Sequence, residues 1–192
     1  IAYELSQYFS IDIHNYKIDY RVMENSRNDN SDMQQLIAAA VPISVVQKYM
    51  AIIKKAGLKL LYIDVAANAY LKILKLDTYP LCLIDFGFTG VDVYMYIDTK
   101  FYLYQDFNYE HLSDELGRFF DYYRSSYGNI QKIICTGGGF NREGISDCLK
   151  SIFNIDPILI EPSMLTIKYD TKGKSVPLQF CLKAIATTLR GE

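Results

Sequence analysis

The 192-residue sequence contains no tryptophan, five prolines and only four cysteines, and it has no excess of positive charge. With a formal net charge of −2, the chain has no basic field that would attract nucleic acid. No segment approaches the roughly 18 consecutive apolar residues that a membrane-spanning helix needs, and no signal peptide is recognisable. We therefore expect neither a nucleic-acid-binding protein nor one that spans a membrane by itself.

The scarcity of cysteine also excludes two kinds of stabilising site. Cys82, Cys135, Cys148 and Cys181 form no CxxC pair. Their spacing argues against a zinc site and against a disulfide framework. We expect free thiols, mostly buried, in a protein from a reducing compartment.

Apolar and aromatic residues, by contrast, are abundant. Half of the residues are hydrophobic and 22% are charged, which is the composition of a folded domain. The 17 tyrosines can fill a core with their rings while their hydroxyl groups reach its edge. The length is enough for one large domain or two small ones.

The first part of the chain, residues 1–76, has the periodicity of a small α+β subdomain. The expected elements are a helix over 2–9, a strand over 16–24, a polar loop over 25–34, a strand over 35–41, a helix over 44–57, a strand over 58–65 and a helix over 66–76. Ser44 is the expected N-cap of the helix over 44–57. Two lysines and Gly57 mark the expected end of this helix.

The second part, residues 77–192, is predicted to be α/β with the order β-β-β-α-β-α-β-α. Strands are expected over 80–90, 91–98, 100–107, 130–139 and 156–162, and helices over 111–128, 141–154 and 176–191. Three consecutive strands with tight connections predict antiparallel pairing. The later strands alternate with helices, which predicts parallel additions to a mixed sheet covered on both faces.

The strand LCLIDFG ends in the first of two glycine turns. Ligands of such sheets bind beyond the carboxyl ends of the strands. Asp85, Gly87, Thr89 and Asp92 have the spacing of a β-hairpin that wraps phosphate. Backbone N–H groups would hold the oxygens, and the two carboxylates could hold Mg²⁺ through water rather than directly. Asp85 could instead simply cap the turn.

The strand IICTGGG ends in the second turn. Gly137, Gly138 and Gly139 would let the backbone lie against a base or ribose at a helix start. A glycine run after a strand is more often an ordinary tight turn. The two turns together, in this strand order, indicate a ligand site more specifically than either alone.

Both turns and their neighbours resemble the type IV pilus assembly protein PilM family, FtsA-related members of the actin-like ATPase superfamily with an actin-like, ribonuclease H-like fold. LIDFGFTGVDVYMYID is similar to the family's second phosphate hairpin. The segments DYYRSSYGNIQKIICTGGGFNREGISDCL and LKAIATTLRG are similar to its adenosine-side turn and its closing helix. In the first part, ELSQYFSIDIHNYKIDYRV and PISVVQKYMAIIKKAGLKLLYIDVAANA are similar to the family's first-half insertion subdomain.

Departures from the family pattern concentrate around the expected nucleotide pocket. Phe88 stands where the family has a small residue against the phosphates, so we expect its ring to crowd a nucleotide in the cleft. Gly90 and Val91 replace threonines. The subdomain that grips ribose and adenine is reduced to about the length of NYEHLSDEL. The chain shows no first phosphate hairpin, which we expect to lie upstream of Ile1 or to be lost. Ala186 replaces a glycine of the last helix.

The resemblance implies a cytoplasmic scaffold of type IV pilus assembly with a degenerate nucleotide pocket. Such a scaffold would sit at the inner face of the cytoplasmic membrane by binding a short tail of a partner resembling PilN, among other pilus assembly components. One wall of the partner groove would come from Tyr8, Phe9, Ile11 and Tyr20. On this interpretation there is no catalytic residue and no cofactor.

Two other interpretations remain open. A functional ATPase would hold ATP and Mg²⁺ at the two glycine turns and switch partner binding or polymerisation. A homo-oligomer or polymer, as in actin relatives, is also compatible with the sequence.

Other polar and aromatic candidates have ordinary structural explanations. His14 and His111 have no carboxylate or cysteine at ligand spacing. The tyrosines at 94, 96, 102 and 104 recur with period two on adjacent strands, which places them on common faces of a hairpin. We expect them to pack in the core or against each other, with an exposed docking surface as the alternative.

Overall fold

A computed structural model describes residues 6, 12–22, 36–77, 80–97, 100–168 and 176–188. The chain divides into two compact units, Ile1–Ile63 and Asp64–Glu192. This division comes before residue 76 because helix α3 (Ala66–Ile73) belongs to the core of the second unit. Ala69, Tyr70 and Ile73 of α3 are fully buried there. None of the described helices is long and apolar enough to cross a membrane.

In the first unit, the described residues form a two-stranded antiparallel sheet, one short helix and one longer helix. Strand β1 (Tyr16–Val22), which follows the short helix η1 (Ile13–Asn15), pairs with β2 (Leu36–Pro42), as the alternation predicted. Helix α2 (Ile43–Lys55) follows β2 directly, with Pro42 at its N-cap, so the expected cap at Ser44 is wrong. The helix expected over 2–9, apart from Ser6, and the loop over 25–34 lie outside the described residues.

The strand expected over 58–65 does not form. The structure assigns neither helix nor strand to these residues, which are all described. Leu58, Leu61 and Ile63 are exposed. A short apolar run forms a strand only where a neighbouring strand pairs with its backbone groups, and this segment pairs with no described strand.

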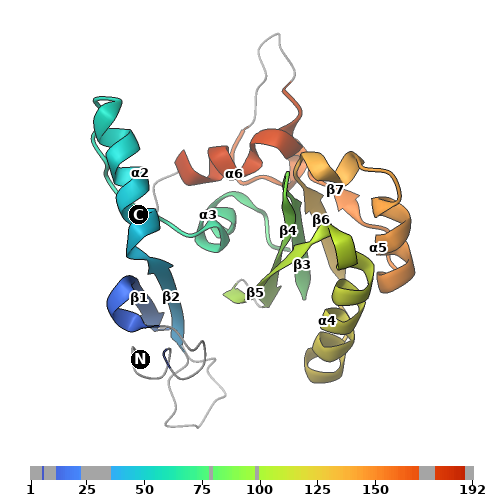
Figure 1. Cartoon of the computed structure of the whole chain (residues 1–192). Coiled ribbons are helices and arrows are strands. Elements are labelled where there is room, and N and C mark those ends of the chain that lie inside the picture. Colours follow the sequence, from blue (N-terminus) through green and yellow to red (C-terminus); the bar gives the residue numbers. More distant parts are fainter. Residues whose placement is uncertain are drawn as a thin grey trace. The chain divides into compact units, whose positions relative to one another are not determined.

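The second unit is built on a five-stranded mixed sheet with the order β5-β4-β3-β6-β7 (Figure 1). The strands are β3 (Leu81–Phe86), β4 (Gly90–Ile97), β5 (Lys100–Asn108), β6 (Lys132–Thr136) and β7 (Ile158–Leu159). The first three pair antiparallel, and β6 and β7 add in parallel beside β3. The remaining elements are η2 (Tyr109–His111), α4 (Leu112–Tyr127), η3 (Gly138–Asn141), α5 (Ile145–Phe153), η4 (Pro162–Met164) and α6 (Leu178–Thr188). The predicted element order and the predicted mixed sheet are confirmed.

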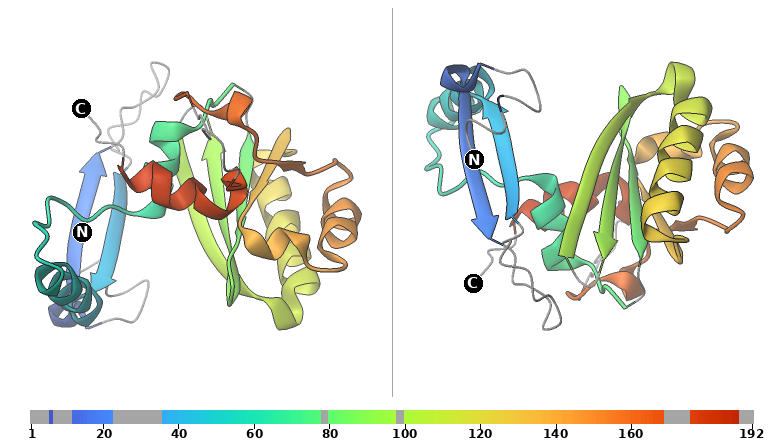
Figure 2. Two further views of the ribbon diagram at one scale, coloured as in Figure 1. Left: turned by 90° about the horizontal axis from the view of Figure 1, so that it is seen from above. Right: turned by 90° about the horizontal axis from the view of Figure 1, so that it is seen from below.

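Helices cover both faces of this sheet (Figure 2). Alternate residues of β3 separate the two layers: Cys82, Ile84 and Phe86 pack with α4 and α5, whereas Leu81 and Leu83 pack with α3 and α6. Strand β3 is buried along its whole length. The free thiols Cys82 and Cys135 lie in the first of these layers.

A β-bulge separates the tyrosines of strands β4 and β5. Tyr94 and Tyr96 are buried on the α3 and α6 face, and Tyr104 is the register partner of Tyr94 on that face. The register shifts between Met95 and Tyr96, which turns Tyr102 away to stack on Tyr127 of α4. The expectation of common faces for all four tyrosines is therefore wrong for Tyr102, because a bulge adds one residue to the alternation.

Candidate functional site

The two glycine turns meet at one edge of the sheet. Strands β3 and β6 are parallel neighbours, so their carboxyl ends lie side by side. A cleft of about 530 Å³ opens between the turns. Its lining comes from the two turns, from α3 and from α6: Tyr70, Asp85, Phe86, Gly87, Phe88, Thr136, Gly137, Gly138, Gly139, Arg142, Gln179, Phe180 and Lys183. The cleft therefore unites Asp85 and Gly87 with the triglycine, as predicted from the strand order, whereas Thr89 is exposed and does not line it.

Gly137 is required by the packing of the two turns. Its φ is +88°, a conformation that side-chain-bearing residues rarely adopt. A Cβ at this position would also collide with the carbonyl oxygen of Phe86 and lie 2.6 Å from Asp85 Oδ1. Glycine is therefore needed here to let β6 approach the end of β3.

The other two glycines are covered by aromatic side chains of the protein itself. A Cβ on Gly138 would lie 2.7 Å from Cε1 of Phe180, which is on α6. A Cβ on Gly139 would collide with the hydroxyl of Tyr109. The flat backbone surface that could receive a base or ribose is thus partly occupied by the chain's own rings.

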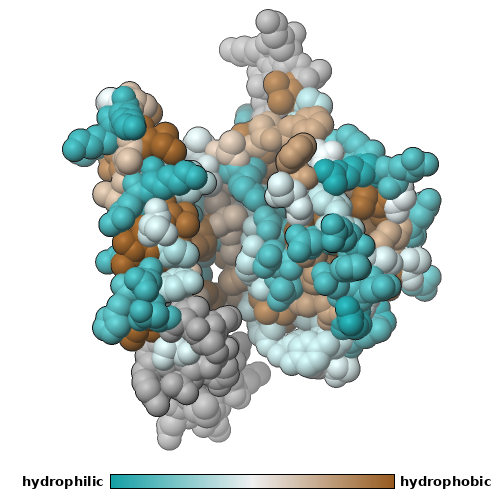
Figure 3. Space-filling view, viewed as in Figure 1, coloured by the Kyte–Doolittle hydropathy of each residue, from teal (hydrophilic) through white to brown (hydrophobic). Residues whose placement is uncertain are grey.

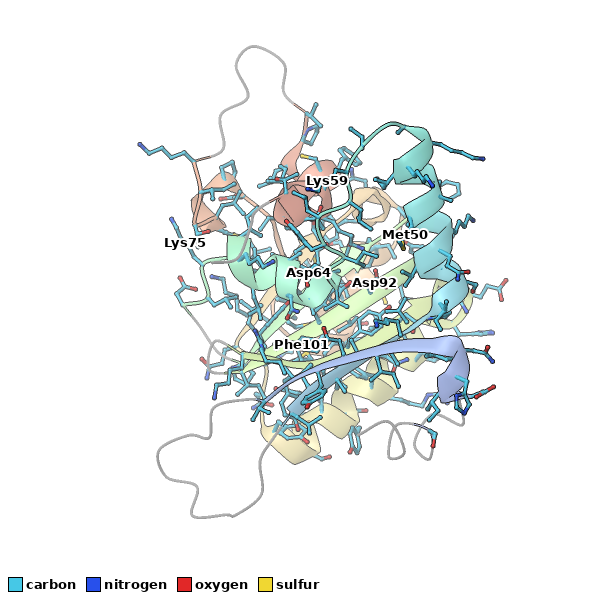
Figure 4. The ribbon with its side chains drawn as sticks, turned by 90° about the vertical axis from the view of Figure 1, so that its left-hand side faces the viewer. Met50, Lys59, Asp64, Lys75, Asp92 and Phe101 are labelled. Carbon is cyan, nitrogen blue, oxygen red and sulfur yellow. The ribbon has the colours of Figure 1, made fainter. Side chains whose placement is uncertain are left out.

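Two carboxylates face each other on the strands of the β3–β4 hairpin. Asp85 on β3 and Asp92 on β4 are direct register partners, and Figure 4 shows Asp92 on its strand. The ammonium of Lys183, which comes from α6, lies 2.6 Å from Asp85 Oδ2 and 3.1 Å from Asp92 Oδ2. The Asp85 side chain is nearly buried, so this ion pair compensates a charge that water solvates poorly.

Tyrosine hydroxyls complete the surroundings of the carboxylates. Tyr70 Oη donates to Asp85 Oδ2 at 2.9 Å. Tyr104 Oη donates to Asp92 Oδ1 at 3.0 Å, and Tyr94 Oη approaches Asp92 Oδ2 at 3.5 Å. Most of the acceptor capacity that a metal-bound water would use is therefore taken by the protein.

The same contacts shift the pKa values of the groups involved. Burial acts to lower the pKa of Lys183, but its hydrogen bonds to Asp85 and Asp92 and their charges outweigh burial and raise it. Burial, followed by the charge of Asp85 and its hydrogen bond, raises the pKa of Tyr70 far above its ordinary value. Lys183 is therefore charged and Tyr70 neutral near pH 7.

Two side chains from other elements donate hydrogen bonds to backbone carbonyls at the tip of the β3–β4 hairpin. Tyr109 Oη donates to the carbonyl of Gly87 at 2.7 Å, and Arg142 Nη2 donates to the carbonyl of Phe88 at 2.7 Å. The Arg142 guanidinium stacks 3.9 Å from the centre of the Tyr109 ring. The Phe88 ring itself is 90% exposed. It lines the mouth of the cleft without being packed into it.

Sequence reasoning missed Lys183, Tyr70, Tyr109 and Arg142. Their roles depend on which elements meet at the sheet edge, and their local sequence carries no motif. One signal was available: Phe180 and Lys183 are three residues apart in the closing helix, so they share one face of it.

Most of the expected partner groove cannot be placed. Tyr8, Phe9 and Ile11 lie outside the described residues, while Tyr20 is on β1 with 54% of its surface exposed. His14 and His111 are exposed. Within the described part of the chain, no group of three or more metal-ligating side chains comes together.

Comparisons with known proteins identify the fold. No family model and no curated protein matches the sequence. Among solved structures, the chain is similar to a PilM–PilN type IV pilus biogenesis complex, with a TM-score of 0.71 and 15% identity over 96% of this chain and 68% of that one. It is also similar to a Bacteroides thetaiotaomicron protein with an actin-like ATPase fold and unknown function, with a TM-score of 0.54 and 11% identity over 98% of this chain and 65% of that one. The chain therefore has an actin-like ATPase fold.

Proposed function

We propose that the chain is an assembly scaffold of the type IV pilus kind, which binds a short tail of a PilN-like membrane protein and does not turn over nucleotide. The observation that carries this proposal is the likeness to the PilM–PilN complex, which extends over 96% of this chain and so includes its first unit. Through its partner, the scaffold would be held at the inner face of the cytoplasmic membrane.

The exposed apolar surface of the first unit supports partner binding. Hydrophobic side chains gather along α2 (Figure 3), where Tyr49, Met50 and Ile52 are exposed, and Tyr20 is exposed on β1. A surface of this kind is typical of a protein interaction site. An extended peptide could bury these side chains and also pair with an open strand edge.

The tail-binding experiment uses the full chain and a fluorescent peptide with the sequence of a PilN-type N-terminal tail. We expect saturable binding, weakened about tenfold by Tyr20→Ser, which removes an exposed ring worth about 1.4 kcal/mol in the complex. Tyr122→Ser is the matched control, because Tyr122 is also more than half exposed but lies on α4 of the second unit. Absence of binding, or equal weakening by both variants, would contradict the proposal.

A second candidate function is nucleotide-dependent switching. The open cleft of about 530 Å³ between the two glycine turns is the observation that favours it. Calorimetric titration of Mg-ATP, with ADP as the control, separates the two functions. No heat and no shift in melting temperature at millimolar nucleotide would support the scaffold. Micromolar binding would raise the melting temperature and would favour nucleotide-dependent switching over the scaffold function.

A further inference from the structure

The arrangement at the carboxylate pair raises a question of charge balance. Asp85 and Asp92 are direct partners on adjacent antiparallel strands. Like charges directly opposite one another destabilise a sheet, and the cost grows because Asp85 is only 7% exposed. A cation is needed between them for the hairpin to be stable in its ionised form.

Two neighbouring carboxylates beside an open cleft are suited to a hydrated divalent cation. In this chain the position is taken by Lys183, whose ammonium contacts both carboxylates. Tyr70 and Tyr104 donate hydroxyl hydrogen bonds to the same two side chains. Most of the oxygen lone pairs that a metal ion or its waters would use are therefore taken, and a divalent cation does not fit while Lys183 is in place.

Helix α6 carries a second group into the same cleft. Phe180, one helical turn before Lys183, lies over Gly138 of the triglycine turn. One helix face thus supplies a ring to one glycine turn and an ammonium to the other turn's carboxylates. Both contacts are made by side chains that local sequence does not mark as ligands.

We propose that Lys183 is a built-in replacement for a divalent cation, which offsets part of the negative charge of the Asp85–Asp92 pair without metal, so that removal of its ammonium uncovers a latent metal site at these two carboxylates. This proposal rests on the proposed scaffold function, because it explains how the fold stays ordered with no nucleotide bound. Its test measures stability and metal binding only, so it can fail or succeed independently of tail binding.

The experiment compares melting temperatures of the full chain in EDTA and in millimolar Mn²⁺ or Mg²⁺. We expect the wild-type value to be the same in all three. Lys183→Met, which keeps much of the apolar stem and removes the charge, should lower the melting temperature by about 4–8 °C in EDTA. Millimolar Mn²⁺ should restore part of this loss, because an ion that binds only the folded state stabilises it.

Two further variants make the result specific. Lys183→Met combined with Asp92→Asn should lose less stability than Lys183→Met alone and gain nothing from Mn²⁺, because one of the opposed charges is gone. Lys150→Met is the matched control, since it removes a lysine from an exposed pair with Asp156; its melting temperature should be nearly unchanged. Lys183→Gln serves as the substitute if Lys183→Met does not fold.

Three outcomes would overturn the proposal. The first is a wild-type melting temperature that rises with Mg²⁺ or Mn²⁺. The second is an unchanged melting temperature for both Lys183 variants. The third is a loss of stability that Mn²⁺ does not restore, which would make Lys183 an ordinary ion-pair partner. If the metal restores stability but wild-type protein binds no tail, the scaffold function fails while the cation replacement stands.

Discussion

The two units of this chain contain similar amphipathic elements but differ in what those elements bury. None of the 13 residues of α2, all of them described, is buried in the first unit. In the second unit the nine-residue helix α5 buries Ile145, Leu149 and Phe153. A periodic apolar face makes a helix plausible, but only a facing layer turns that face into core. The second unit has such layers on both faces of its sheet. In the described part of the first unit, a two-stranded sheet is the only sheet that could cover α2.

This difference assigns different tasks to the two units. The second unit has two packed layers of buried side chains, one on each face of its sheet, and a domain gains its stability from such layers. The first unit keeps apolar side chains at its surface, as a binding module does. A two-stranded sheet is marginally stable in water by itself, so the first unit should depend on what it contacts.

The largest expected effect comes from separating the units. Residues 64–192 expressed alone should fold cooperatively, because both core layers lie within them. Residues 1–63 alone should remain largely unfolded. Far-ultraviolet circular dichroism with guanidinium denaturation measures both. A cooperative unfolding transition in the 1–63 fragment would contradict the claim that only the second unit folds by itself.

The next effect concerns glycines of the second unit. Gly137→Ala should cost about 3 kcal/mol or more, because it combines an unfavourable φ with a backbone collision. Gly144→Ala shares the positive φ but meets no atom within 4 Å, so it should cost about 1–2 kcal/mol. Gly117→Ala, inside α4 and free of both problems, should stabilise by about 0.5–1 kcal/mol. Urea denaturation gives the three values, and equal costs for Gly137 and Gly144 would disprove the close approach of the turns.

Alkaline pH should destabilise the second unit. Burial raises the pKa values of Tyr70, Tyr94 and Tyr96, so these groups stay protonated in the folded state at pH values where unfolded tyrosine, with a pKa near 10, ionises. The pKa of Lys183 is also raised, so its contribution is complete below the ordinary value of 10.5 and declines as pH rises through the folded value. The folded state then binds more protons, and the free energy of unfolding falls above about pH 10.

Tyrosinate absorbance and circular dichroism, recorded in one titration, check this effect. The buried tyrosines should ionise together with unfolding. Ionisation of these tyrosines while the circular dichroism is still native would contradict their tight packing.

The smallest expected effect comes from the exposed face of α2. Ile52→Ala should change the free energy of unfolding by less than about 0.5 kcal/mol, because the side chain is half exposed and lies outside the packed core. Leu149→Ala, at a fully buried position of α5, should cost about 2–5 kcal/mol. Thermal denaturation of the two variants measures the difference. A similar cost at both sites would mean that α2 is covered within the folded chain.

The sequence predicted most of the second unit because its strands and helices differ clearly in period and are separated by turn residues. The order of its elements, its antiparallel and parallel pairings and the meeting of Asp85 with the triglycine follow from that pattern. The strand predicted over 58–65 is wrong because its formation does not depend on local residues alone. Its short apolar run is typical of a strand, but strand formation depends on a partner strand that local sequence does not contain.

The site was predictable only as far as strand ends could locate it. Phe88 was expected to crowd the cleft, yet its ring is exposed at the hairpin tip while Arg142 holds the Phe88 carbonyl. The β-bulge that redirects Tyr102 gives no signal in the alternation of residues 100–107. Such features depend on one residue more or less in a register, which period alone does not determine.

By itself, the sequence determined the class of fold, the order of elements and the edge of the sheet where a site would form, because periodicity and glycine placement are local properties. Only the tertiary structure decided what occupies that edge. Lys183 lies 91 residues beyond Asp92 in the chain, and it reaches the carboxylate pair because α6 packs on the face of the sheet that carries Leu83 and Tyr94. Contacts between residues so distant in sequence arise from packing, which local sequence does not determine.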